Sequence, residues 1–138
     1  MNRRGLTLVE VSIVITIMAI LAMIALPSMK LTVKRGDELE LKRVLRNTRE
    51  AIDRYYKQQE EINGGGIEAL NYPKNFEAMI EAKVLRTIPV DPIAGKAEWR
   101  FISSTDDILS KETNGDNLWD LRSLSEDTAI NETLYSSW

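Results

Sequence analysis

The stretch RRGLTLVEVSIVITIMAILAMIAL, residues 3–26, decides how this 138-residue chain is organised. Its last 21 residues, Leu6–Leu26, are apolar except for three small hydroxyl side chains and one ionisable residue, Glu10. A helix of this length can cross ~30 Å of hydrocarbon. The run is longer than the apolar core of a secretory signal, and no A-x-A-like site follows it. The sequence therefore predicts one membrane-spanning helix.

Glu10 is the unusual residue of this segment. A carboxylate costs ~2.5–3.5 kcal/mol at the centre of a bilayer on insertion scales, and less near the edge, where Glu10 lies. One interpretation is that its side chain is hydrated near the membrane surface, or protonated and neutral. Basic residues flank both ends of the run, so charge alone does not orient the span.

The helix is expected to continue beyond the membrane to Ile62. Pro27 lacks a backbone donor, which predicts a kink or a weakened turn. Beyond Gly36, apolar and half-apolar side chains occupy ~140° of one helix face, which predicts that the helix packs against its own head. Asn63 and three glycines end the pattern. The stripe consists of Leu41, Val44, Leu45, Thr48, Ala51, Ile52, Tyr55 and Tyr56.

The opposite face of this helix carries unlike charges four residues apart. This spacing predicts ion pairs worth a few tenths of a kcal/mol each. The expected pairs are Glu38–Lys42, Glu50–Arg54 and Asp53–Lys57.

The remaining sequence predicts a small head. Asn75 is suited to cap a short helix that has Phe76, Met79 and Ile80 on one face. AEWRFIS, residues 97–103, and NLWDLRS, residues 117–123, resemble two strands of an antiparallel hairpin. RTIPVDPIAG, residues 86–95, is a turn-rich connector, and residues 124–138 show no readable pattern. The expected fold class is α+β, with a long helix packed on a small antiparallel sheet.

Composition narrows the function. The net charge is −3 without a basic cluster, which argues against nucleic acid as a partner. The chain has no cysteine and no histidine, so it has no disulfide, no thiolate metal site and no histidine base. Neither a nucleophile–base pair nor a phosphate loop is present, and we therefore expect no enzymatic activity.

Together these features resemble the type IV pilin-like proteins, which share a basic leader, a cleavable glycine and a hydrophobic helix with a glutamate. The leader MNRRG, Thr7, Glu10 and Pro27 fall at that family's spacings. Leu6 stands where most members have phenylalanine or methionine, and it keeps the position apolar. YPKNFEAMIEAKVLRTIPVDPIAG, residues 72–95, further resembles the segment after the long helix in major pseudopilins of type II secretion systems. LWDLRS and the final SSW fit the C-terminal region of those pseudopilins.

The resemblance implies a processing site and an orientation. A prepilin peptidase would cut between Gly5 and Leu6 and methylate the new amine of Leu6. Glu10 would then pair with the N-terminal amine of a neighbouring subunit, and Pro27 would belong to the same assembly segment. The implied divisions are a cytoplasmic leader, residues 1–5, a transmembrane and assembly helix, residues 6–30, and a periplasmic head, residues 31–138.

The implied function is that of a structural subunit in a type II secretion pseudopilus of the bacterial inner membrane. Its partners would be further copies of itself, minor pseudopilins, the prepilin peptidase and an inner-membrane assembly platform. An alternative is a type IV pilus subunit for adhesion, motility or DNA uptake, although such pilins usually close a C-terminal loop with two cysteines. An alternative of another class is a membrane-anchored periplasmic enzyme or binding domain.

Calcium is the one cofactor to consider, because major pseudopilins often hold it near the C-terminus. The nearest carboxylate and amide candidates are Asp127, Asn131 and Glu132. The usual run of closely spaced aspartates is absent, so a solvated loop is the competing interpretation. A second, weaker group of candidates is Asp106, Asp107, Asn114 and Asp116.

Overall fold

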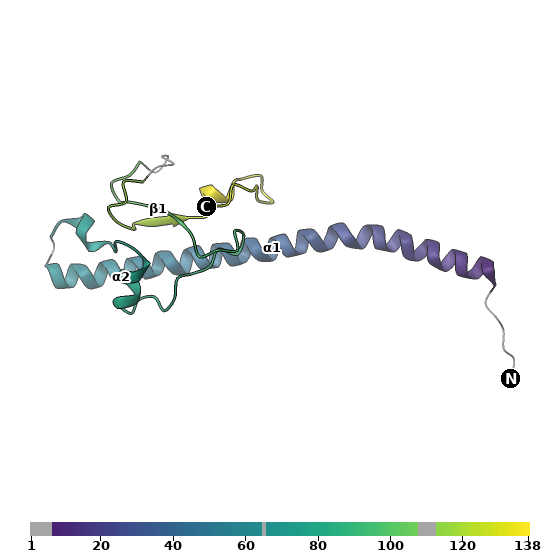
Figure 1. Ribbon diagram of the computed structural model, residues 1–138, viewed down its shortest axis with the longest axis horizontal. Coiled ribbons are helices and arrows are strands. Elements are labelled where there is room, and N and C mark those ends of the chain that lie inside the picture. Colours follow the sequence, from purple (N-terminus) through teal and green to yellow (C-terminus); the bar gives the residue numbers. More distant parts are fainter. Residues whose placement is uncertain (1–6, 65, 108–112) are drawn as a thin grey trace, which may run out of the picture. The chain divides into compact units, whose positions relative to one another are not determined.

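The computed structural model describes residues 7–64, 66–107 and 113–138, without the side chains of residues 26–28 (Figure 1). Its elements in chain order are α1 (Leu8–Asn63), η1 (Glu68–Asn71), α2 (Phe76–Glu81), β1 (Arg100–Ile102), β2 (Asp120–Arg122) and η2 (Tyr135–Ser137). The predicted fold class is confirmed. The fold is α+β and pilin-like, with a long N-terminal helix and a small two-stranded antiparallel sheet.

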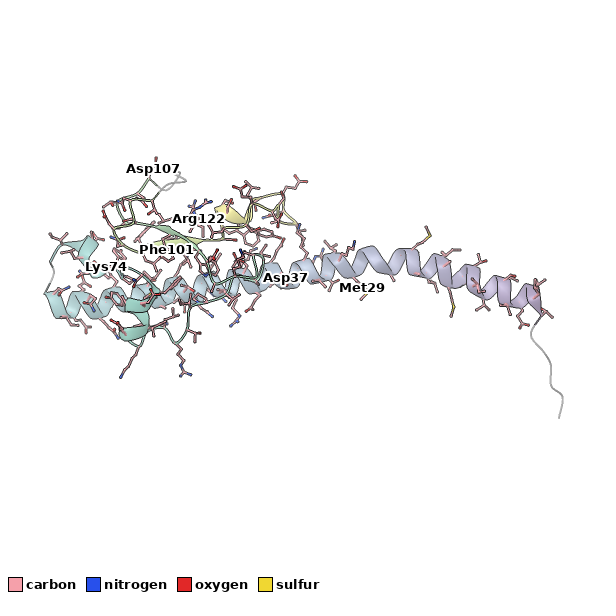
Figure 2. All side chains as sticks on the ribbon, in the orientation of Figure 1. Met29, Asp37, Lys74, Phe101, Asp107 and Arg122 are labelled. Atoms are coloured by element: carbon pink, nitrogen blue, oxygen red, sulfur yellow. The ribbon has the colours of Figure 1, made fainter. Side chains whose placement is uncertain are left out.

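The chain divides into two compact units, residues 1–36 and residues 37–138. In the first unit α1 is long and apolar enough to span a membrane, because its most apolar 18-residue window has a mean hydropathy of 2.6. None of the residues of this window is buried. The backbone stays helical through Pro27, so the proline does not end the helix. Met29, labelled in Figure 2, is 65% exposed.

The second unit is built around the predicted stripe, and its packing against the head is confirmed. Five stripe side chains are at most 2% exposed: Leu41, Leu45, Thr48, Ala51 and Ile52. Their partners in the core are Phe76, Met79, Trp99, Leu118, Leu121, Ala129 and Tyr135. Burial of one apolar helix face, more than helix propensity, is what stabilises a helix of this kind.

The predicted hairpin is also confirmed. β1 and β2 are antiparallel, with Phe101 opposite Leu121, so both of these apolar side chains lie on one face of the sheet. Phe101 packs edge-on against Phe76 of α2, with ring centroids 5.3 Å apart. Figure 2 shows Phe101 on the hairpin, among the side chains that fill the head.

The short helix α2 begins where the sequence predicts. The Asn75 side chain accepts a hydrogen bond from the backbone N–H of Ala78 at 3.0 Å, which is an N-cap. Phe76 and Met79 are buried and Ile80 is half-buried, so the predicted apolar face is confirmed.

The three predicted ion pairs are wrong. Within the part of the chain that the structure describes, none of them forms. Glu40 pairs instead with Arg43 at 2.5 Å on the surface. Arg49 reaches Asp120 at 2.7 Å. Isolated four-residue pairs contribute only a few tenths of a kcal/mol, and tertiary contacts easily outweigh them.

Candidate functional site

Glu10 lies in the first turns of α1, beside a helix cap. Its backbone N–H donates to Thr7 Oγ1 at 3.3 Å, so Thr7 serves as the N-cap of the helix. The Glu10 side chain is exposed, and its carboxylate has no hydrogen-bond or ion-pair partner among the described residues. The first unit thus presents an unpaired carboxylate on an uncovered apolar helix.

The other polar side chains of this segment are satisfied within the helix. Ser12 Oγ donates to the carbonyl of Leu8, and Thr16 Oγ1 donates to the carbonyl of Ser12, both at 2.8 Å. Hydroxyls bonded to a carbonyl four residues earlier can enter lipid at little cost. The Glu10 carboxylate cannot be satisfied in this way, because a carboxylate only accepts hydrogen bonds and the helix carbonyls around it are acceptors too.

The predicted cleavage and methylation site, Gly5 and Leu6, lies outside the described residues. Pro27 lies in the helical backbone of α1, and its side chain is not among those described. The roles of these three residues stay predictions.

The C-terminal segment, residues 127–138, is held against α1 by Glu38 and Lys42. Glu38 Oε1 accepts two hydrogen bonds, from Ile130 N–H at 2.7 Å and from the Tyr135 hydroxyl at 2.9 Å. Lys42 Nζ lies 4.4 Å from the ring centroid of Trp138, a cation–π contact. The two residues predicted to pair with each other therefore anchor a segment about 90 residues further along the chain.

Tyr135 is the buried centre of this contact. Only 1% of it is exposed. Burial and the hydrogen bond to Glu38 raise the pKa of Tyr135 to about 12. The folded state therefore favours the neutral phenol, and its contribution to stability is complete below about pH 10 and declines as the pH rises towards 12.

We expect Tyr135→Phe to cost ~1 kcal/mol at neutral pH, because one hydrogen bond to Glu38 is lost. Between about pH 10 and pH 12 the difference in stability between the two proteins should shrink. In this range the Tyr135 phenol of the wild-type protein ionises when unfolding exposes it, which favours the unfolded state, and the phenylalanine variant has no such group. Thermal melts of the detergent-solubilised full chain measure both values. An equal loss of thermal stability in the two proteins between about pH 10 and pH 12 would contradict the raised pKa of Tyr135.

Two of the three C-terminal calcium candidates, Asp127 and Asn131, accept local hydrogen bonds through their side chains. Asn131 Oδ1 accepts from both the backbone N–H and the hydroxyl of Thr133, at 3.3 and 2.7 Å. Asp127 accepts from the hydroxyl of Ser125 at 3.3 Å. Glu132 has a φ of 66°, in the left-handed region. In the described ranges no three His, Cys, Asp or Glu side chains gather as a metal site, and calcium binding stays a prediction.

The weaker group of candidates lies in the loop between the strands. Hydrogen bonds from Thr113 and from the backbone N–H groups of Ser103 and Asn114 hold the pKa of Asp106 below its usual value. Asn114 Oδ1 accepts from the backbone N–H of Asp116 at 3.0 Å. These bonds organise the loop through its own side chains.

Asp91 is a structural residue that sequence reasoning missed. It is fully buried, and its Oδ1 accepts from the N–H groups of Ile93 and Ala94 at 2.8 and 3.1 Å. Its Oδ2 accepts from the hydroxyl of Ser123 at 2.5 Å. The sequence did contain a sign of this turn, because an aspartate before Pro-x-x-Gly is suited to accept hydrogen bonds from the N–H groups of a turn. Gly95, which closes the turn, has a φ of +67°, in the left-handed region that favours glycine.

Comparison with known proteins adds one finding. Residues 1–26 match the family model of the prokaryotic N-terminal methylation motif. No curated protein and no solved structure matches the chain. The matched residues include the leader, the Gly5–Leu6 bond and Glu10, and they support a type IV pilin-like subunit, a prepilin peptidase substrate that assembles into filaments.

Proposed function

We propose that this chain is a structural subunit of a type II secretion pseudopilus. Prepilin peptidase removes residues 1–5 and methylates Leu6, and the subunit waits in the inner membrane with its head in the periplasm. The N-terminal helices of many copies then pack into a filament that helps to drive protein export. The chain itself carries out no catalysis.

The observation that carries this proposal is the unpaired carboxylate of Glu10 on an uncovered apolar helix. An unpaired carboxylate and an unpaired ammonium each cost several kcal/mol in a medium of low dielectric constant. Pairing Glu10 with the N-terminal amine of a neighbouring copy removes both costs. The pair forms at only one axial offset, and it therefore sets the register of the filament.

Two features support the secretion type over the adhesive pilus. The chain has no cysteine pair to close a C-terminal loop. The IPVDPIAG segment, residues 88–95, which resembles secretion pseudopilins, forms a turn around the buried Asp91.

Deletion of the gene in its native host tests this assignment. We expect exported proteins to accumulate in the periplasm while surface pili, motility and DNA uptake stay normal, and a plasmid copy should restore export. Loss of pili with intact export would instead identify a type IV pilus subunit.

A further inference from the structure

A basic cleft lies in the second unit, residues 37–138. Its volume is about 340 Å³. One wall is a face of α1 with Lys42, Arg46 and Arg49, which fall within ~60° of each other around the helix. The floor is Leu45, and the other wall is the C-terminal segment, with Asn131, Thr133, Ser137 and Trp138.

The cations of this cleft are not equivalent. Arg49 is neutralised by Asp120, with Nε and Oδ1 2.7 Å apart. Lys42 Nζ lies over the ring of Trp138 and forms no ion pair with a carboxylate among the described residues. Arg46 is exposed, and its guanidinium has no hydrogen-bond or ion-pair partner in the described part of the chain. The cleft therefore has excess positive charge and a free planar donor, which suits a carboxylate.

This positive charge is exceptional in its surroundings. Residues 37–138 contain 13 basic and 20 acidic side chains, a net charge of −7. A second copy of the chain therefore offers many carboxylates to the cleft. In a filament that copy is held at high local concentration, so even a weak contact is populated.

The end of α1 offers the most suitable carboxylates. Glu60 and Glu61 are exposed in its last turn, and that turn has no basic residue. Carboxylates there face the negative end of the helix dipole, which is unfavourable, and a cation from outside relieves the repulsion. Arg46 and Glu60 are ~21 Å apart along one helix, so they do not meet within one copy.

We propose that the cleft around Arg46 binds Glu60 and Glu61 of a second copy of this chain. The two patches differ and lie at different heights on the head, so the contact is heterologous and repeats without closing, as a filament requires. This inference rests on the proposed function, and it adds a head-to-head contact that sets the stagger together with the helix core.

Charge reversal in the full-length protein tests the contact. We expect Arg46→Glu to reduce filament yield about tenfold, since a pair is lost and a repulsion added. The matched control is Arg86→Glu, the same change at an exposed arginine outside the cleft, which should assemble normally. Adding Glu60→Lys and Glu61→Lys to Arg46→Glu should restore assembly. Arg46→Glu filaments as abundant as those of the control, or no recovery in the combined variant, would overturn the proposal.

A cross-link gives a readout independent of yield and leaves the charges intact. The chain has no cysteine, so Ser137→Cys in the cleft combined with Gln58→Cys beside the acidic turn introduces the only thiols. Oxidised filaments should give a ladder of multimers, and each single variant should not. Filaments of the double-cysteine variant that form as abundantly as wild-type filaments but give no ladder would contradict this contact alone. A wild-type chain that forms no filaments would contradict the proposed function.

Discussion

Glu10→Ala is expected to abolish filaments while membrane insertion and leader removal proceed normally. The substitution makes the helix more apolar, so insertion should not suffer. Assembly fails because the amine of the neighbouring copy has no partner in the filament core, at a cost of several kcal/mol per subunit. Filament yield from membranes, with the amount of processed subunit as reference, measures the effect.

Two further variants isolate the charge of Glu10. Glu10→Gln keeps the shape and removes the charge, and it should behave like the alanine variant. Ser12→Ala is the control, because it changes a polar residue half a turn from Glu10. The Ser12 hydroxyl already donates to the carbonyl of Leu8 in its own helix, so this variant should assemble normally. Wild-type filament yield from Glu10→Gln would show that the carboxylate is merely tolerated in the membrane.

The second large effect concerns the leader. Intact-mass measurement of the membrane-extracted protein should show the loss of residues 1–5 and the gain of one methyl group on Leu6. Gly5→Val should leave the chain uncut, because a peptidase site that selects glycine has no room for a branched side chain. A mature wild-type protein that still begins at Met1 would remove the pilin-like interpretation.

Gly36→Val is the matched control for this substitution. Gly36 lies in α1, and a Cβ atom there would meet nothing within 4 Å. A valine at this exposed position changes helix propensity only slightly relative to glycine, so processing should be normal. Equal loss of processing in both variants would point to general damage instead of a specific site.

The sequence alone predicted every element whose signal is periodic or local. The apolar run and the stripe from Leu41 to Tyr56 gave the helix, because hydrophobic periodicity is set by which face must be buried. Asn75 marked the start of α2 through its own side chain, and the alternation in residues 97–103 and 117–123 predicted the hairpin. The leader and Glu10 were recognisable because they fall at the fixed spacing of a short linear motif, the prokaryotic N-terminal methylation motif that residues 1–26 match.

Only the tertiary structure decided which partners the charged side chains take. Glu38 and Lys42 have the spacing of a helix pair, yet they hold Tyr135 and Trp138, and Arg49 reaches Asp120. A surface pair four residues apart gains a few tenths of a kcal/mol, whereas satisfying the buried hydroxyl of Tyr135 avoids a larger cost. The order in residues 127–138 and the cleft around Arg46 exist only because distant parts of the chain fold together, and local pattern carries no record of such contacts.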